Sequence, residues 1–423
     1  RRITRSEALS IAPSEDLLAR LESPAGGGGR VHEVLRAARN QASSVVVLAL
    51  WAIANVAVLA VGLRPDVRAP MPTDLALRWT HATALAIDLN AALILVPVLR
   101  RLLTRVRASW FGHFVPVDGA IDFHRVVGHG LAALSVVHVA AVGFAYAMGH
   151  PHGTLGAFVY GTRLGATGAA LVGVFAVMWA LSLDFIRRTR RFELFFFSHA
   201  LYALWFALAF LHAPSLMRWV AVALVGFCVE QLLRVRRSGQ PTEVTSFEAL
   251  RSGVVRLDLR RPPGFAYHPG DYVFLRIPAV AEHEWHPFTL SSAPERDDLS
   301  VHVRALGNWT AALRERIERM EAGDLPPTLA VHIDGPYGSP TAHLFRAKHA
   351  VLIGAGIGVT PFASVLGSLV ARAEAGAELT LRKGYFIWLN RDQYSFEWFN
   401  DLLADVERRD RGGLLDIQLY MTG

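Results

Sequence analysis

The chain has 423 residues, of which 52% are hydrophobic and 19% are charged, and its formal net charge is +7. That length exceeds one compact core, and the composition is too apolar for an ordinary soluble protein, so we expect a membrane region joined to soluble domains. The single cysteine, Cys228, excludes a disulfide framework within the chain and a thiolate metal site.

The start of the chain carries no signal-peptide pattern, and it opens with Arg1 and Arg2 rather than methionine. We therefore expect a fragment of a longer protein, in which residues 1–40 form a cytosolic N-terminal segment. No EF-hand loop pattern occurs in that segment.

Residues 43–234 form a series of apolar runs, each long enough for a membrane helix of roughly 20 residues. We expect six membrane-spanning helices, at about 43–63, 82–99, 122–148, 163–186, 194–213 and 216–234. The loops after the second, fourth and sixth runs are rich in arginine: Arg100, Arg101, Arg105, Arg107, Arg187, Arg188, Arg190, Arg191, Arg234, Arg236 and Arg237. Because cationic loops stay in the cytosol, both termini are predicted to be cytosolic, in a plasma or bacterial inner membrane. The basic charge thus reflects topology rather than nucleic-acid binding.

Histidine is costly inside a bilayer and is therefore a candidate functional residue there. In the third run, fourteen residues separate His124 from His138, so both rings share one helix face about 21 Å apart along the axis. Thirteen residues separate His199 from His212 in the fifth run, at matching heights. The four histidines thus form two pairs at two depths in the membrane, and the imidazoles of each pair face each other. This arrangement predicts two bis-histidine haems stacked across the membrane.

Other interpretations of these histidines stay open. They could be hydrogen-bonded residues that mediate helix packing, whereas isolated metal ions fit less well because no carboxylate or thiol accompanies them. His129 lies on a different face and is expected to be a packing or surface residue. Trp205 lies between the two levels, where it either shortens an electron path or packs as an ordinary aromatic side chain.

After residue 238 the pattern changes to short alternating strands and turns. The proline-broken strand His286–Ser292 presents a histidine, a backbone edge and hydroxyls, which suits a flavin ring and its ribityl chain. The strand of residues 300–305 leads into Gly307–Thr310 at a helix N-terminus. Free N–H groups there, together with Arg304, favour a pyrophosphate.

The strand Val351–Ile353 runs directly into a glycine-rich segment, Gly354–Pro361. Glycines let the backbone approach a dinucleotide phosphate, and the helix that follows caps it. An expected turn at Asp334–Gly338 and a second strand at Tyr385–Leu389 support a nucleotide site. Arg391, just past that strand, is placed to meet a 2′-phosphate, which favours NADPH over NADH. A solvent-exposed loop arginine is the alternative.

Several independent motifs follow one another in the second half of the chain: HPGDY, HPFTLSS, GNWT, GPYG, GAGIGVTP and FIWLNRDQYSFEWF. In this order they resemble the dehydrogenase half of the NADPH oxidase branch of the ferric-reductase transmembrane superfamily. The paired histidines resemble that family's haem ligands. The FEWF segment is more similar to eukaryotic oxidases and the calcium-regulated subgroup than to iron-uptake reductases. Taken together, the motifs most resemble calcium-regulated or prokaryotic NADPH oxidases.

The resemblance implies a six-helix transmembrane haem bundle over residues 41–237, followed by a ferredoxin-reductase-like dehydrogenase module. That module would combine a β-barrel FAD-binding domain (238–345) with an α/β Rossmann-like NADPH-binding domain (346–423), which we expect to be C-terminally incomplete. The implied inner haem ligands are His124 and His199, and the outer ones are His138 and His212. The implied FAD residues are His286, Pro287, Phe288, Thr289, His302, Arg304, Trp309 and Thr310. The implied NADPH residues are Gly335, Pro336, Gly354, Gly356, Gly358, Thr360, Pro361 and Arg391.

The resemblance implies hydride transfer from NADPH to FAD, then single-electron transfer through two b-type haems to dioxygen on the far side, giving superoxide. A basic residue near the outer haem is also implied, for which Arg78 and His81 are candidates, although either could simply lie at the membrane interface. The short loop Ala213–Met217 leaves no room for an extracellular lid. Two other functions stay open: a transmembrane ferric-chelate reductase, which differs only in the acceptor, and a non-enzymatic cytochrome b-type membrane protein that carries haem.

Overall fold

A computed structural model describes residues 42–64, 75–149, 154–187, 192–238, 241–391, 393–410 and 413–422. The predicted N-terminal segment, residues 1–40, lies outside the described residues, as do Arg188, Arg190 and Arg191. The described chain divides into two compact units, a helical unit (Ser43–Arg236) and a C-terminal unit (Arg237–Gly423), each of which is described by itself.

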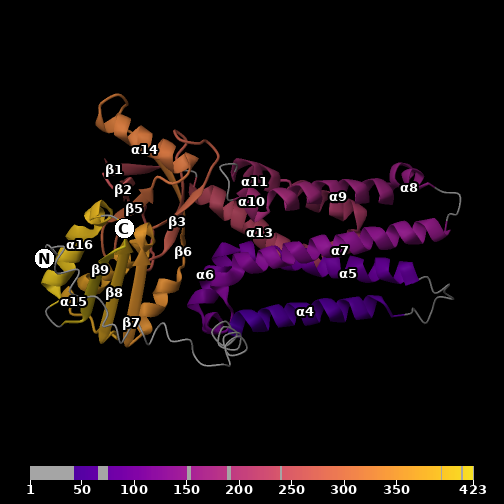
Figure 1. The fold of residues 1–423 in the computed structure, drawn as a ribbon, viewed down its shortest axis with the longest axis horizontal. Helices are drawn as coiled ribbons and strands as arrows, with labels where there is room; N and C mark the ends of the chain where they lie inside the picture. The colour runs from indigo at the N-terminus through magenta and orange to yellow at the C-terminus, as the bar shows by residue number, and fades with distance from the viewer. Residues whose placement is uncertain are drawn as a thin grey trace. The chain divides into compact units, whose positions relative to one another are not determined.

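The helical unit consists of apolar helices joined by short helical turns (Figure 1). Its main helices are α4 (Ala42–Gly62), α5 (Leu75–Leu93), α7 (Ala120–Gly149), α9 (Arg163–Leu181), α11 (Phe192–His199), α12 (Tyr202–His212) and α13 (Met217–Ser238). The shorter elements are η1 (Val96–Val98), α6 (Arg100–Ala108), η2 (Trp110–His113), η3 (Val117–Gly119), α8 (Leu155–Gly161), α10 (Asp184–Arg187) and η4 (Pro214–Leu216). Helix α5 packs against α7, and α12 packs against α9, so the unit is a helical bundle.

Among the described residues, seven helical stretches are long and apolar enough to cross a membrane. Six of them lie in the helical unit and correspond to the six predicted runs. The second begins at Leu75, earlier than the predicted residue 82. The polar residues near its start fit an apolar helix because the Thr80 and Thr83 hydroxyls donate to carbonyls of the same helix.

Two of these spans are not continuous α-helices. Pro97 has no N–H to continue the helical hydrogen bonding, so α5 ends at Leu93 and the short helix η1 follows. The fifth span divides just after His199, where the N–H of Leu201 bonds to the Ser198 carbonyl three residues earlier, at 3.1 Å. The two histidines of this run therefore lie on separate helices, α11 and α12, rather than on the single helix that their spacing assumed.

The first lobe of the C-terminal unit, called the barrel lobe, is an antiparallel sheet in the order β4-β3-β6-β1-β2-β5. Its strands are β1 (Thr242–Ala249), β2 (Val254–Arg260), β3 (Tyr272–Arg276), β4 (His286–Thr289), β5 (Asp298–Arg304) and β6 (Ala330–Tyr337). A bridge between Leu290 and Val301 connects the two edges, so the sheet curls toward a closed barrel. Helix α14 (Asn308–Glu321) packs Leu313 and Ile317 into the core of this lobe.

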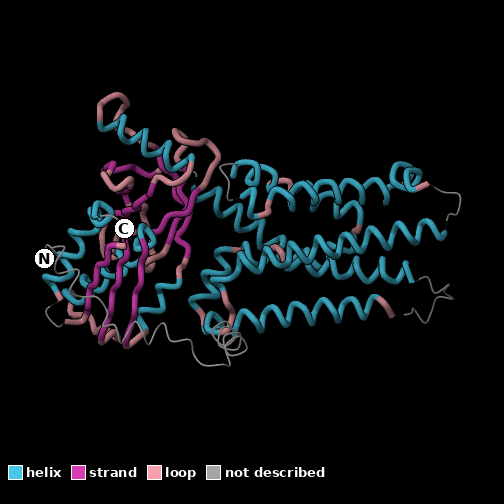
Figure 2. The backbone as a smooth tube through the Cα atoms, viewed as in Figure 1, coloured by secondary structure: helices cyan, strands magenta, loops and turns pink. Residues whose placement is uncertain are grey.

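The second lobe, called the sheet lobe, is built on three parallel strands in the order β7-β8-β9 (Figure 2). Its elements are η5 (Pro340–Arg346), β7 (His349–Ala355), η6 (Gly356–Val359), α15 (Thr360–Glu374), β8 (Lys383–Asn390), η7 (Gln393–Phe399), α16 (Asn400–Arg409) and β9 (Leu415–Met421). Helix α15 buries Leu366 and Leu369 in one cluster with Phe386 and Trp388 of β8. The seventh apolar stretch, Gly356–Glu374, is therefore interpreted as a core helix of this lobe rather than a membrane span.

The turn predicted at Asp334–Gly338 is wrong, because strand β6 continues to Tyr337. Strand β6 carries one more residue than β3 across this stretch, which is a β-bulge. Pro336 has no N–H for the ladder, and a Cβ added at Gly335 would lie 2.9 Å from Val273. These two residues therefore shape the strand itself.

Candidate functional site

The four histidines predicted as metal ligands form two pairs inside the helical unit. The rings of His124 on α7 and His199 on α11 have centroids 6.1 Å apart. His138 on α7 and His212 on α12 form the second pair, close enough to interact electrostatically. Each pair joins two different helices, as two axial ligands of one metal would.

Each of these imidazoles is held through its Nδ1 atom. The Nδ1 partners are the Ile94 carbonyl for His124 (2.9 Å), the Thr83 hydroxyl for His138 (3.1 Å), the Ser182 hydroxyl for His199 (3.3 Å) and the Thr167 hydroxyl for His212 (2.9 Å). These contacts leave the Nε2 atom of each ring for another partner.

The hydroxyl partners determine which nitrogen carries the hydrogen. Each hydroxyl donates its only hydrogen to the carbonyl four residues earlier: Thr83 to Trp79 (2.6 Å), Thr167 to Arg163 (2.8 Å) and Ser182 to Met178 (2.6 Å). A hydroxyl that has donated its hydrogen can only accept from the imidazole. The three rings therefore carry their hydrogen on Nδ1 and keep a lone pair on Nε2, the atom that is then free to bind a metal.

The fourth imidazole, His124, is held by the backbone, and Pro97 explains why. In a continuous helix the Ile94 carbonyl would accept the N–H of Val98. The break at Pro97 redirects that N–H to the Leu95 carbonyl at 3.2 Å. The Ile94 carbonyl is then available to His124, and because a carbonyl only accepts, His124 also carries its hydrogen on Nδ1.

These pairs fit an iron porphyrin better than a bare metal ion. A haem would take two imidazoles as protein ligands when bound, and His124 and His199, whose ring centres lie 6.1 Å apart, would have room for one metal between them. In the described part of the chain, no three histidine, cysteine or acidic side chains gather as a metal site. Gly168 allows the close approach of helix α9, since a Cβ added there would lie 3.1 Å from Cε1 of His212.

Trp205, predicted to lie between the two histidine levels, is half-buried on α12. Its ring centre lies 6.1 Å from that of Phe175 on α9 and 5.1 Å from that of Phe206. These contacts account for Trp205 as a packing residue, and they place an aromatic ring inside the bundle.

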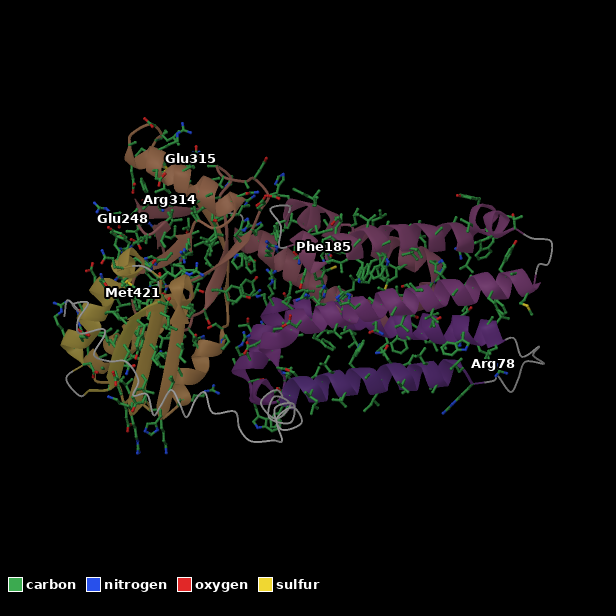
Figure 3. The ribbon with its side chains drawn as sticks, viewed as in Figure 1. Arg78, Phe185, Glu248, Arg314, Glu315 and Met421 are labelled. Carbon is green, nitrogen blue, oxygen red and sulfur yellow. The ribbon has the colours of Figure 1, made fainter. Side chains whose placement is uncertain are left out.

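The two candidates for a basic residue near the outer pair lie toward the start of α5. Arg78 is in its first turn (Figure 3), and His81 is exposed, with its Nδ1 3.5 Å from the Gly62 carbonyl. The α5 side chain that contacts the outer pair is Thr83, which the sequence interpretation missed. Its signal was a hydroxyl residue within an otherwise apolar stretch, and the same signal applies to Thr167.

Helices α6 and α10, which follow the second and fourth spans, lie at one end of the helical unit (Figure 1). The Glu230 carboxylate on α13 accepts the N–H groups of Arg101 and Leu102, at 3.0 and 3.1 Å, at the start of α6. Arg125, at the start of α7, donates to both carboxylate oxygens of Asp184 on α10, each at 2.8 Å. The sixth span is thereby held to the end of the second, and the end of the fourth span to the start of the third.

In the barrel lobe, His286, Phe288 and Trp309 form an aromatic stack. The His286 ring lies 4.4 Å from the Trp309 ring at an interplanar angle of 29°, and Phe288 lies 5.7 Å from it at 26°. Trp309 is buried, yet its Nε1–H has no partner among the described residues. A buried donor of this kind beside stacked rings can serve a ligand.

Glu284, which the sequence interpretation missed, binds His286 of this stack. Its Oε2 lies 2.8 Å from the imidazole Nε2. The two residues are spaced by two along an extended segment, which puts them on the same face. That spacing could have identified Glu284 as a partner of His286 from the sequence. The neighbouring Pro287 is exposed on the edge strand β4, where its missing N–H is tolerated, and Thr289 pairs with Tyr272 of β3.

Thr310 and Arg304 lie around the start of α14. The Thr310 hydroxyl accepts the N–H groups of Leu306 and Gly307, at 3.0 and 2.9 Å, and so fixes this helix start. Arg304 reaches the sheet lobe, since its Nη1 lies 3.2 Å from the position of a Cβ added at Gly356. A narrow space of about 10 Å³ lies here, lined by Ser252, Arg304, Gly356, Asn390, Ser395 and Trp398.

His302, predicted to contact FAD, lies where the two lobes meet. Its ring stacks on Trp398 of the sheet lobe at 4.4 Å and 30°, and its Nδ1 lies 2.8 Å from the Ser291 hydroxyl. Burial, helped by the charge of Arg256, lowers the pKa of His302 to about 3. The ring is therefore neutral at physiological pH, and its buried Nε2 has no partner among the described residues.

The glycine-rich segment connects β7 to α15. A Cβ added at Gly354 would lie 3.2 Å from Val359, and Gly356 has a φ of +52°, so both positions favour glycine. Trp388, a buried residue not predicted for the site, donates its Nε1–H to the Gly356 carbonyl at 3.0 Å. Pro361 occupies the first turn of α15, where a missing N–H costs nothing.

The remaining predicted nucleotide residues are dispersed. The Thr360 hydroxyl donates to the Ile357 carbonyl at 3.0 Å and begins α15, while Gly358 has open space where a Cβ would lie. Arg391 is exposed directly after β8. Gly335 and Pro336 belong to β6 of the barrel lobe.

Comparison with protein families agrees with this arrangement along the chain. The family described as "Ferric reductase like transmembrane component" matches residues 89–210. An FAD-binding domain family matches residues 241–341, and "Ferric reductase NAD binding domain" matches residues 347–423.

Two named relatives are similar over most of this chain. NADPH oxidase 5 of Homo sapiens is 35% identical over 402 residues, which is 79% of this chain and 52% of that protein. A superoxide-generating NADPH oxidase heavy chain of Dictyostelium discoideum is 31% identical over 433 residues, which is 92% of this chain and 82% of that protein. The chain thus spans about half the length of the human relative. Among solved structures, a ferredoxin NADP+ reductase from Neisseria gonorrhoeae with bound FAD and NADP is 16% identical, covering 43% of this chain and 66% of that one at a TM-score of 0.33.

The helices and the matched families together define an integral, multi-pass membrane flavoprotein of the ferric-reductase type. It has FAD-binding and nucleotide-binding domains after its membrane region. Given its identity to the Dictyostelium relative over most of both chains, the protein belongs to the NADPH oxidase family.

Proposed function

We propose that this protein is a transmembrane NADPH oxidase, which takes electrons from cytosolic NADPH and delivers them to dioxygen across the membrane, producing superoxide. Superoxide generation is the activity in the name of the Dictyostelium relative, which supports the proposal. The FAD-binding and NAD-binding families at residues 241–341 and 347–423 support the donor side.

We assign one b-type haem to each histidine pair, His124 with His199 and His138 with His212. When bound, haem supplies a one-electron centre, and two stacked centres provide a path through the bilayer. The observation that supports this assignment most strongly is that all four rings are bonded through Nδ1. From these bonds we infer one common tautomer with the Nε2 lone pair free. Histidines that only mediate helix packing have no need of one shared tautomer.

We assign FAD to the barrel lobe and NADPH to the sheet lobe beside it. FAD, when bound, accepts a hydride and releases single electrons. Arg304 and the start of α14 supply positive charge for a pyrophosphate. Glycine at positions 354 and 356 lets a nucleotide approach the backbone between β7 and α15. The proposed FAD residues are His286, Pro287, Phe288, Thr289, His302, Arg304, Trp309 and Thr310. The proposed NADPH residues are Gly335, Pro336, Gly354, Gly356, Gly358, Thr360, Pro361 and Arg391.

We place the arginine-rich end of the helical unit in the cytosol, following the positive-inside rule. Both ends of the chain are then cytosolic, and the pair His138 with His212 is the outer one. Arg78 and His81 are the candidates for a dioxygen site on the outer side, and Trp205 is the candidate for an aromatic bridge between the two pairs.

The test uses the full-length protein in detergent, supplied with FAD and reduced by NADPH. We expect a low-spin bis-histidine haem spectrum, oxygen uptake, and cytochrome c reduction that superoxide dismutase abolishes. The His138→Ala variant should lose one of two haems. The His129→Ala variant is the matched control, because His129 is an exposed histidine of the same helix whose Nδ1 accepts from Trp179 at 3.0 Å. Retention of two haems in His138→Ala would overturn the ligand assignment.

A ferric-chelate reductase is the second candidate function, favoured by the family descriptions matched at residues 89–210 and 347–423. The same preparation distinguishes the two candidates. If a ferric chelate is reduced rapidly while oxygen uptake stays at background, the electron acceptor is ferric iron rather than dioxygen. The haem and flavin assignments would be unaffected by that outcome.

A further inference from the structure

One face of helix α15 is bonded to a short segment of the barrel lobe. Ser364, Ser368 and Arg372 are spaced by four residues, so they line one side of the helix. All three contact residues 292–295, the segment that directly follows β4 and the Ser291 position. The helix that begins at the glycine-rich segment is thereby joined to the end of the proposed flavin motif.

The contacts are short and specific. The Ser364 hydroxyl donates to the Ser292 carbonyl at 2.6 Å. One oxygen of Glu295, Oε1, accepts both the Ser368 hydroxyl at 2.8 Å and the Arg372 Nε–H at 3.1 Å. Between these bonds the helix lies close to the segment, since a Cβ added at Gly367 would be 3.3 Å from Cβ of Ala293.

Burial indicates that these hydroxyls are present for the bonds they make. Ser364 and Ser368 are both 0% exposed. Alanine would fill a buried helix position with a better helix propensity and no hydroxyl to satisfy. Serine at both positions is therefore explained by the bonds to the other lobe.

The receiving segment is itself held rigidly inside the barrel lobe. The Tyr267 hydroxyl donates to the Ser292 carbonyl at 3.1 Å, and the Ser300 N–H donates to the Ser292 hydroxyl at 2.9 Å. Burial raises the pKa of Tyr267 to about 12, so its hydroxyl remains a donor at physiological pH. Helix α15 is thus anchored to a segment after β4 that the barrel lobe holds in place.

We infer that Ser364, Ser368, Arg372 and Glu295 are positioning residues that align the sheet lobe on the barrel lobe, and so set the approach of NADPH to the flavin. The inference rests on the proposed function for its kinetic consequence. In that step NADPH loses a hydride to become NADP+, and the flavin gains the hydride and a solvent proton. None of the four side chains needs to touch either cofactor, because their effect passes through the placement of α15.

The kinetic test is anaerobic stopped-flow reduction of the flavin by NADPH in the full-length protein. For the double variant Ser364→Ala/Ser368→Ala we expect about 10-fold slower reduction, with unchanged FAD content, NADPH Kd and reduction by dithionite. For Glu295→Gln, which keeps the serine contact but loses a partly exposed ion pair, we expect about 3-fold slower reduction. The Ser364→Ala change leaves the Ser292 carbonyl bonded to Tyr267, so the barrel lobe keeps its own contacts.

The matched control is Glu374→Gln. Glu374 lies on the same helix but pairs with Arg409 of α16 within the sheet lobe, so its loss should leave flavin reduction at the wild-type rate. Wild-type rates in the serine and Glu295 variants would overturn the inference. Equal slowing in Glu374→Gln would also overturn it, as would a weaker NADPH Kd that accounts for the whole effect.

A second readout needs no nucleotide. Hydrogen exchange should speed up at the amides of residues 292–296 and along α15 in Ser364→Ala/Ser368→Ala, by about 3-fold or more, but not at residues 292–296 in Glu374→Gln. Unchanged exchange would refute the alignment role. If NADPH fails to reduce the flavin of the wild-type protein, the proposed function fails, while this exchange experiment still decides the alignment of the lobes.

Discussion

Replacing Thr83 by valine removes the atom that orients the outer imidazole on α7 while keeping the shape of the side chain. Thr83 is 0% exposed, and its oxygen lies 3.1 Å from Nδ1 of His138. Without that acceptor the Nδ1–H keeps only the Thr80 carbonyl as a partner, and the loss of one such hydrogen bond costs about 0.5–1.5 kcal/mol. Loss of such a partner of a metal ligand typically weakens metal binding by about 10–100-fold. We therefore expect partial loss of one haem per chain.

The same change should also move one redox potential. The bond from Nδ1–H makes imidazole a stronger donor, which stabilises oxidised iron more than reduced iron. If this preference is worth about 1 kcal/mol, the potential of the outer haem rises by about 40 mV when the bond is lost. A potentiometric titration of the purified protein, followed at the haem bands, should show one component shifted and the other unchanged.

Thr80→Val is the matched control for this prediction. The Thr80 hydroxyl donates to the Ala76 carbonyl at 2.9 Å on the same helix, so the control loses the same kind of helix bond but no histidine partner. If Thr83→Val and Thr80→Val give the same haem content and the same two potentials, the assigned tautomer and its role are refuted.

Three further changes test other parts of the site. Gly168→Ala should push the ring of His212 aside and reduce the absorbance of one haem, because the new Cβ would lie 3.1 Å from the ring. Glu284→Gln should weaken FAD binding about 3-fold, measured by fluorescence on FAD titration, because the ring of His286 loses its 2.8 Å carboxylate partner. In the folded protein the pKa of His302 is lowered to about 3. Between pH 6.5 and that value, His302 therefore binds a proton in the unfolded chain but not in the folded one. Stability should thus fall by up to about 1.4 kcal/mol per pH unit as the pH drops below 6.5, and less steeply in His302→Phe, measured by FAD release on heating.

Each of these changes has a control in the chain. Gly173→Ala, on the same helix as Gly168, meets nothing within 4 Å and should keep both haems. Glu282→Gln changes an exposed carboxylate two residues from Glu284 and should leave FAD affinity unaltered. The control for His302→Phe is His268→Phe, which replaces an imidazole that is 78% exposed. An effect in a control equal to that in its test variant would contradict the corresponding prediction.

The histidine pairs could be predicted from spacing, because a helical repeat fixes which residues share a face. Thr83 and Thr167 stand out in the sequence as hydroxyl residues in apolar stretches. Which hydroxyl meets which histidine could not be predicted, because that depends on how the neighbouring helices are placed. The division of the fifth span after His199 was missed for a related reason. It involves neither proline nor glycine, so no local residue preference marks it.

In the C-terminal unit, the glycine-rich segment and the first FAD motif were recognisable from residue type and order alone. The location of His302 was not, because its stacking partner Trp398 comes from a distant part of the chain. The end of strand β6 could not be predicted either, since Gly335 and Pro336 favour a turn locally and the bulge that accommodates them depends on pairing with β3.

The break at Pro97 has a consequence for how this protein can vary during evolution. Three of the four imidazoles are oriented by side-chain hydroxyls, so a single codon change can retune each of them. The fourth, His124, is oriented by a main-chain carbonyl at Ile94, which every amino acid supplies. The bond to His124 thus does not depend on which side chain stands at residue 94. It depends instead on the helix break made by Pro97, three positions further along the chain.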